Sequence, residues 1–134
     1  MPPTPLVVLE IDDNTPADGA PFTYDVSMWS FADDLNLRTR TAAGTFRNLL
    51  SLAGSGTFRG YPERAAAATK SLFDGFVVES EVTWLTAREL AGDRRWLPTG
   101  NSEVERSLQM LFETIDVAAR HFGLDRIRLV FAFV

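Results

Sequence analysis

The chain has 134 residues, of which 46% are hydrophobic and 23% charged. A chain of this length and composition can bury a core without cross-links, so we expect one domain spanning residues 1–134 and no extensive disorder. It contains no cysteine, which excludes disulfides and thiolate chemistry, and its net charge of −5 argues against bulk binding of nucleic acid. No apolar run approaches the roughly 18 residues of a membrane helix, and no basic signal-peptide segment is present, so we expect a cytoplasmic protein.

The first half of the chain predicts one strand and three helices. A β-branched run near 6–11 that leads into Asp12 and Asp13 is typical of a strand entering a turn. Apolar residues on one helical face predict helices near 26–35 and near 45–53. A proline in the first turn predicts a further helix near 62–73.

The second half predicts two strands and two helices. Alternating residues near 76–84 indicate a strand with one exposed face. Thr86 and Glu89 have the spacing of a capping box and begin a helix near 86–92, and the same spacing precedes the longest helix, near 102–122. The segment near 126–134 is apolar on both faces towards its end, which is typical of a central strand.

Strands at both ends and near the middle, with helices between them, predict an α+β fold. We expect a small mixed or antiparallel sheet that helices cover on one side.

The charges are unevenly distributed. Residues 1–34 carry seven acids and no Lys or Arg, whereas residues 35–70 carry six bases and one acid. Either these segments offset each other within a subunit or across a dimer, or the basic segment faces a small anion. Arg supplies 12 of the 13 bases, and its planar guanidinium can donate two parallel hydrogen bonds to a phosphate or a carboxylate.

Two loops offer candidate ligand contacts. In the glycine-rich stretch 54–60, backbone amides can approach a phosphate while an Arg supplies charge and neighbouring aromatic rings supply a stacking face. The alternative interpretation of this stretch is a flexible connector. The loop at 94–96 combines Arg and Trp, which are enriched where binding energy concentrates. The candidate ligand-binding residues are Phe58, Arg59, Tyr61, Arg94, Arg95 and Trp96.

Catalytic and metal-binding residues have little support. His121 is the single histidine, so neither a zinc site nor a Ser-His-acid triad is indicated. The doublets Asp12-Asp13 and Asp33-Asp34 could hold a divalent metal, although acidic doublets at element ends are usually solvated. We therefore expect no metal, no cofactor and no catalytic residue.

Four stretches occur in an order that points to a known group of proteins. They are Tyr24-Asp25 with Trp29 and Phe31, then Arg59-Gly-Tyr-Pro62, Thr83-Trp-Leu-Thr-Ala-Arg-Glu-Leu90 and Arg128-Leu-Val-Phe131. Over most of its length, from about residue 5 to 134, the chain resembles a family of small, uncharacterised phage and bacterial proteins. It departs from the family pattern at Glu79 and Glu81, where a His is frequent, and at its end, Val134, where a polar pair is frequent.

The resemblance implies a modulator of host pathways, such as a phage counter-defence protein that sequesters a nucleotide immune signal. Our leading hypothesis is a non-enzymatic, homo-oligomeric protein that binds a small anionic ligand. The first alternative is an inhibitor or adaptor that binds a host protein through the acidic N-terminal segment. The second is a metal-dependent enzyme that uses Asp or Glu.

Overall fold

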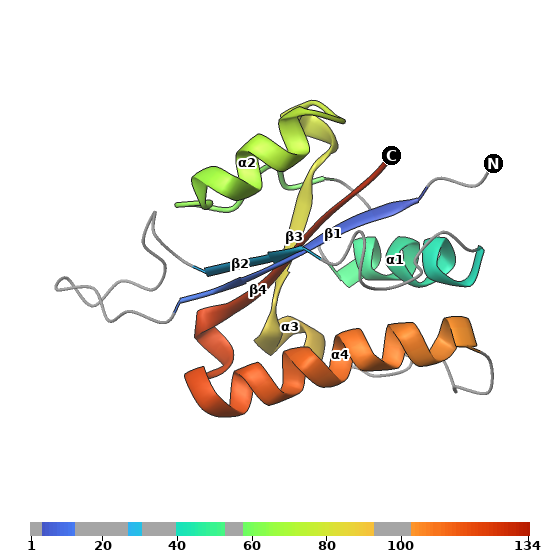
Figure 1. The fold of residues 1–134 in the computed structure, drawn as a ribbon, viewed down its shortest axis with the longest axis vertical. Coiled ribbons are helices and arrows are strands. Elements are labelled where there is room, and N and C mark those ends of the chain that lie inside the picture. Colours follow the sequence, from blue (N-terminus) through green and yellow to red (C-terminus); the bar gives the residue numbers. More distant parts are fainter. Residues whose placement is uncertain (1–3, 13–26, 31–39, 53–57, 93–102) are drawn as a thin grey trace, which may run out of the picture.

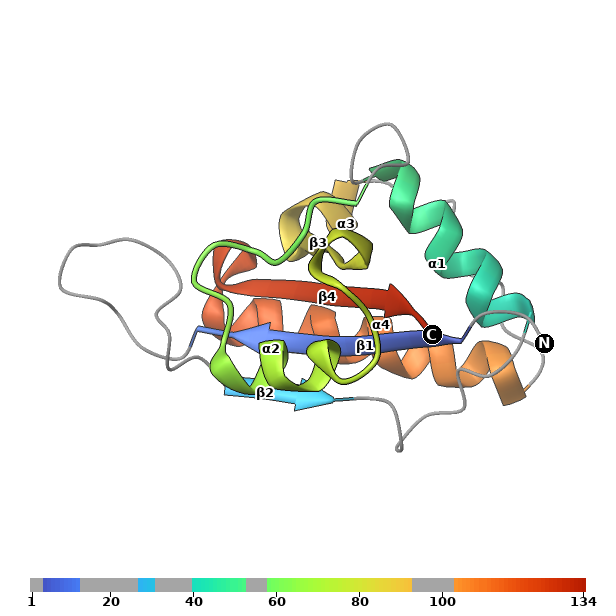
Figure 2. The ribbon, with the colours of Figure 1, turned by 90° about the horizontal axis from the view of Figure 1, so that it is seen from above.

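The computed structural model describes residues 4–12, 27–30, 40–52, 58–92 and 103–134. These ranges form a four-stranded antiparallel sheet, in the order β2-β1-β4-β3, and four α-helices (Figure 1, Figure 2). The predicted α+β class is confirmed. In chain order the elements are β1 (Pro5–Ile11), β2 (Ser27–Ser30), α1 (Arg40–Leu52), α2 (Ala67–Asp74), a 3₁₀ turn (Glu79–Glu81), β3 (Thr83–Thr86), α3 (Ala87–Gly92), α4 (Glu103–Phe122), a second 3₁₀ turn (Leu124–Arg126) and β4 (Ile127–Phe133).

The centre of the sheet is the long pair β1 and β4, both predicted from their apolar runs. They pair from Pro5 opposite Phe133 to Ile11 opposite Ile127, and all seven residues of β1 are buried. Because successive side chains point to opposite faces, both faces of this pair are apolar and both need a cover.

Helices lie on both sides of the sheet, so the expectation of a cover on one side was wrong. Figure 1 shows α2 above the sheet and α3 and α4 below it, and the packing of buried side chains places α1 on the side of α4. Phe73 of α2 is fully buried against Leu6 and Val8 of β1 and Val130 of β4. The four-helix arrangement therefore creates two apolar layers that share the central strands.

Two helices that the apolar periodicity predicts, near 102–122 and near 45–53, are confirmed. In α4 the buried stripe of Leu108, Leu111, Phe112 and Ile115 faces the sheet. The helix α1 covers residues 45–52 of the predicted range 45–53 and begins five residues earlier, at Arg40, whereas residue 53 lies outside the described residues. Among the described helices, none is both long and apolar enough to cross a membrane.

The predicted helix near 26–35 was wrong at residues 27–30, which form the edge strand β2. The strand pairs with β1, with Leu9 opposite Trp29 and Ile11 opposite Ser27. Hydrogen bonding to the open edge of β1 outweighs the helical spacing of the local sequence. The rest of that predicted helix, residue 26 and residues 31–35, lies outside the described residues.

The predicted strand near 76–84 was wrong over most of its length, because only Thr83 and Trp84 belong to β3. The amides of Phe76 and Val77 both donate to the carbonyl of Phe73 at 2.9 Å, so the chain turns tightly at the end of α2. The segment then forms a 3₁₀ turn. This local hydrogen bonding removes residues 76–82 from the sheet.

The helix predicted near 62–73 begins later, at Ala67. Residues 63 and 64 form a turn in which Arg64 has a positive φ of 57°. The amide of Ala66 donates to the Glu10 carboxylate at 2.9 Å. A contact with a strand 56 residues away in the sequence therefore sets the start of α2.

Candidate functional site

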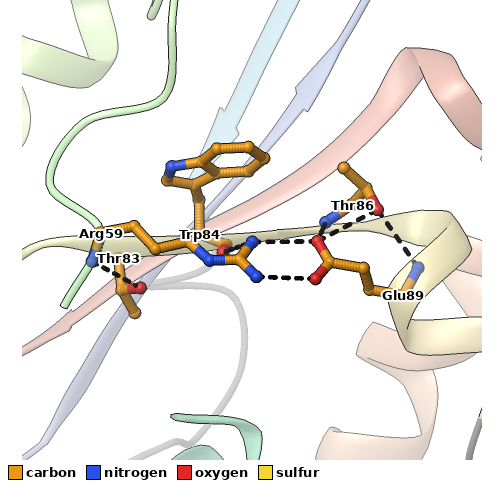
Figure 3. A network of polar contacts seen from close by, with 5 residues as sticks. All are labelled: Arg59, Thr83, Trp84, Thr86 and Glu89. Carbon is orange, nitrogen blue, oxygen red and sulfur yellow. Dashed lines mark hydrogen bonds and ion pairs between the residues drawn. The ribbon is translucent and has the colours of Figure 1, made fainter. Parts of the chain in front are cut away.

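Arg59, the central residue of the predicted ligand loop, lies against the open edge of β3 (Figure 3). Its amide donates to Thr83 Oγ1 at 3.2 Å, and its guanidinium Nη1 donates to the carbonyl of Trp84 at 3.0 Å. The next amide, of Gly60, donates to the carbonyl of Val82 at 2.8 Å. Arg59 and Gly60 thus hydrogen-bond to the start of β3 and to the residue before it, on the edge that no strand covers.

The Arg59 guanidinium forms a two-point ion pair with Glu89 in α3. Nη1 donates to Oε1 at 2.9 Å and Nη2 to Oε2 at 2.7 Å, and the guanidinium carbon lies 5.0 Å from the centre of the Trp84 ring. Hydrogen bonding to Glu89 raises the pKa of Arg59, and hydrogen bonding from Arg59 lowers the pKa of the Glu89 carboxyl. The geometry is that of an Arg stacked on an aromatic ring and holding an anion, with the anion supplied by the chain itself.

Glu89 is also the acidic member of the capping box that the sequence predicts. The amide of Thr86 donates to Glu89 Oε1 at 3.1 Å, and the amide of Glu89 donates to Thr86 Oγ1 at 3.2 Å (Figure 3). One carboxylate therefore caps α3 and neutralises Arg59. An external anion at Arg59 would have to replace this carboxylate.

Tyr61, the aromatic candidate of the same loop, faces α2. Its hydroxyl donates to Asp74 Oδ1 at 2.6 Å, and its ring packs edge-on against Phe73 with 6.4 Å between centres. Burial raises the pKa of the Tyr61 phenol, and Asp74 and Glu79 raise it further. Lys70 Nζ lies 6.0 Å from the centre of the Tyr61 ring, but the hydroxyl is already engaged by Asp74, so an anionic ligand at this hydroxyl would compete with that carboxylate.

The other predicted ligand contacts are only partly described. Phe58 is exposed, with 39% of its surface accessible. Arg94, Arg95 and Trp96 lie outside the described residues, so whether they approach Arg59 stays a prediction.

A buried ion pair that the sequence interpretation missed joins β1 to β4. Arg128 Nε donates to Glu10 Oε1 at 2.6 Å, and the two side chains are 4% and 0% exposed. Thr69 of α2 donates to the other carboxylate oxygen at 2.6 Å, and Arg128 also donates to the carbonyls of Glu63 and Arg64. Burial lowers the pKa of Arg128, and the charge of Glu10 opposes this effect. The sequence did carry a signal for this pair, because Glu10 and Arg128 are each a single charged residue within an apolar strand.

This network also changes the interpretation of the acidic N-terminal segment. Glu10 and Asp12 are fully buried, so neither presents a charge to a partner. The remaining acids of the segment lie outside the described residues: Asp13, Asp18, Asp25, Asp33 and Asp34.

His121 lies exposed near the end of α4. Within the described ranges no group of three or more His, Asp or Glu side chains is arranged to hold a metal ion. The doublet Asp33-Asp34 lies outside those ranges.

Exposed apolar and acidic side chains follow one another at the end of α2 and on the loop that connects α2 to β3. Phe76 and Val78 are 63% and 58% exposed, and Asp74, Glu79 and Glu81 beside them are also exposed. We call these five residues the acidic loop surface. Sequence reasoning placed most of them in a strand, so it did not recognise them as a surface loop.

Comparison of the chain with protein families, with characterised proteins and with solved structures gave no significant match. The resemblance to the phage and bacterial family therefore stays a hypothesis that rests on the motifs given above.

Proposed function

We propose that the protein acts by binding rather than by catalysis, as an inhibitor or adaptor that docks a basic, partly apolar segment of another protein on the acidic loop surface. The observation that carries this proposal is the exposure of Phe76 and Val78 in one short loop that is bordered by acids. Residues 71–87 contain three acids and no Lys or Arg. Exposed apolar side chains within a rim of one charge are typical of protein interaction sites.

The loop is well ordered by its own contacts, which supports a binding role. Its two ends are fully buried side chains, Phe73 and Val82, and Val77 packs between the exposed residues against the same apolar layer. The amide of Glu81 donates to the carbonyl of Val78 at 2.9 Å. A preformed loop loses little conformational entropy when a partner binds, so more of the contact energy appears as affinity.

A pull-down from cell extract tests this proposal, with the wild type compared with Phe76→Ala/Val78→Ala and with Glu79→Lys/Glu81→Lys. We expect one protein to be retained by the wild type, lost with both double variants, and released by about 0.5 M salt because screening weakens charge pairing. Phe58→Ala is the matched control, since it removes an exposed aromatic ring outside the loop and should leave retention unchanged. Equal retention by all four proteins would refute the assignment.

A second candidate, the sequestration of a small anion such as a nucleotide, rests on the stacked Arg59. The guanidinium already holds a carboxylate in two-point geometry over Trp84, so a ligand phosphate could take the place of Glu89. Because Glu89 already occupies the Arg59 guanidinium, this candidate function is weaker than the binding of a protein partner.

Calorimetric titration with AMP distinguishes the two candidates. If an anion binds at Arg59, Glu89→Gln should bind AMP at least tenfold more tightly than the wild type does, and Arg59→Ala should not bind it. Arg88→Ala serves as the control because Arg88 belongs to a separate surface ion pair with Asp125. Equal AMP affinity in Arg59→Ala and the wild type would rule out this site.

A further inference from the structure

The outward side of α4 carries an apolar stripe that no contact within the described residues covers. Met110 and Val117 are 57% and 42% exposed, although the opposite side of the same helix forms the main core. Phe122, one turn after the buried Ala118, is 39% exposed at the end of the helix. The three exposed residues border a shallow, mainly apolar groove together with the small residues Thr114 and Ala118. Small residues between larger ones allow a second helix to approach closely.

Charged side chains flank this stripe in an order that selects its occupant. Glu113 lies four residues before Val117, and Arg120 and His121 lie three and four residues after it. Asp116, directly before Val117, borders the same surface and has an interaction within the chain. At a rise of about 1.5 Å per residue, Glu113 and the two bases stand roughly 4.5–6 Å on either side of Val117 along the helix axis. In the described part of the chain, neither Glu113 nor Arg120 is engaged in an ion pair.

We propose that the protein forms a homodimer in which two copies of α4 pack antiparallel about a two-fold axis at Val117. In this arrangement Glu113 of each copy lies level with Arg120 and His121 of the other, and Met110 lies level with the second copy's Leu124. A parallel arrangement would set Glu113 against Glu113, so charge selects the antiparallel one. A surface that matches itself about a two-fold axis is what a symmetric dimer requires.

This surface is independent of the acidic loop surface. Figure 1 shows α4 below the sheet and the loop that follows α2 above it. A dimer of this kind would therefore present two acidic loop surfaces that point away from the shared interface. If the protein proves to be monomeric, the proposed protein-binding function is unaffected. If no protein partner binds the acidic loop surface, the dimer proposal is unaffected.

Sedimentation equilibrium tests the proposal, since a monomer has a mass of 14.9 kDa. We expect the wild type to shift to twice this mass as its concentration rises, and Val117→Glu to stay monomeric because two carboxylates would meet at the axis. Val78→Glu, an equivalent change on the acidic loop surface, should dimerise like the wild type. The circular dichroism of each variant verifies that it is folded.

A charge exchange tests the pairing itself. Glu113→Arg should weaken the dimer at least tenfold because it faces Arg120 of the other copy, and so should Arg120→Glu. The double variant Glu113→Arg/Arg120→Glu should recover most of the loss. A monomeric wild type at about 1 mM, or a dimer that Val117→Glu and both single charge reversals leave intact, would overturn the proposal.

Discussion

Glu10 and Arg128 show how two residues organise a large part of the molecule. The pair lies across the central strands, and its remaining polar atoms bond to Thr69 and to the backbone before α2. A buried charge is tolerated only when its partners satisfy it, so the pair ties α2 to the sheet at one orientation.

Removing one member of this pair should cost far more than removing a surface pair. We expect Arg128→Met to lower the free energy of unfolding by about 3–5 kcal/mol, because Glu10 would stay buried without its counter-charge. The matched variant Arg88→Met, which breaks the exposed pair with Asp125, should change it only slightly. Urea unfolding at pH 7 measures both, and equal midpoints for the two variants would contradict the prediction.

The ion pair of Glu89 should make stability depend on pH. The pKa of Glu89 is lowered in the folded state from its ordinary value of 4.5, chiefly by Arg59, so the folded protein favours the ionised form. The stabilisation is therefore complete above about pH 4.5 and is lost as the pH falls through the lower, folded-state pKa.

Glu89→Gln isolates this contribution, because Gln retains the oxygen that caps α3. We expect the wild type to exceed the variant in unfolding free energy by about 1 kcal/mol at pH 7, with the difference shrinking below about pH 4. Urea unfolding at pH 7, 5 and 3.5 provides the measurement. A difference that grows as the pH falls would have the wrong sign for this mechanism.

At the scale of elements, β3 pairs with β4 on one side, and its outer edge is covered by the segment 58–60 rather than by a further strand. Gly60 has a φ of +80° and donates its amide to the carbonyl of Val82. A side chain at this φ is strained whatever the surrounding space, so a glycine allows the segment to follow the edge. By covering β3, the segment also reduces the risk of edge-to-edge association.

Two glycine-to-alanine substitutions should change the stability of the protein in opposite directions. Gly60→Ala should destabilise the protein by about 1–2 kcal/mol through backbone strain. Gly44→Ala, within α1, should stabilise it by about 0.5–1 kcal/mol, because an added methyl group at Gly44 meets no atom within 4 Å and Ala favours a helix. Thermal and urea unfolding of both variants checks this, and effects of the same sign would refute the explanation.

At the scale of the whole molecule, the central strands join two apolar layers into one cooperative unit. Val7 and Leu9 of β1 belong to different packing environments from Leu6 and Val8, which lie on the α2 side. Since neither layer can lose its strands without exposing the other, we expect the described fold to unfold as a single unit.

Phe73 and Phe76 provide a matched test of this view. Phe73→Ala should cost about 3–5 kcal/mol because it empties a fully buried position in the α2 layer. Phe76→Ala, three residues later and exposed, should change stability by no more than about 0.5 kcal/mol. Circular dichroism and tryptophan fluorescence should give coincident unfolding curves for each variant, whereas separate transitions would indicate that the α2 layer unfolds independently.

Much of the fold follows from local sequence. The apolar stripe of α4, the capping box of Thr86 and Glu89, and the apolar runs of β1 and β4 each specify an element through neighbours a few residues apart. Of the candidate site, the loop residues Phe58, Arg59 and Tyr61 were correctly placed in a non-helical connection between α1 and α2.

The tertiary structure decided what depends on distant partners. β2 forms because β1 offers hydrogen bonds, and α2 begins late because Glu10 takes the amide of Ala66. Arg59 and Glu89, 30 residues apart, become partners only when the segment 58–60 lies along β3. The sequence by itself determined the elements whose hydrogen bonds and apolar periodicity are local, whereas tertiary structure determined which charges meet, because side chains far apart in the chain find each other only after the sheet has formed.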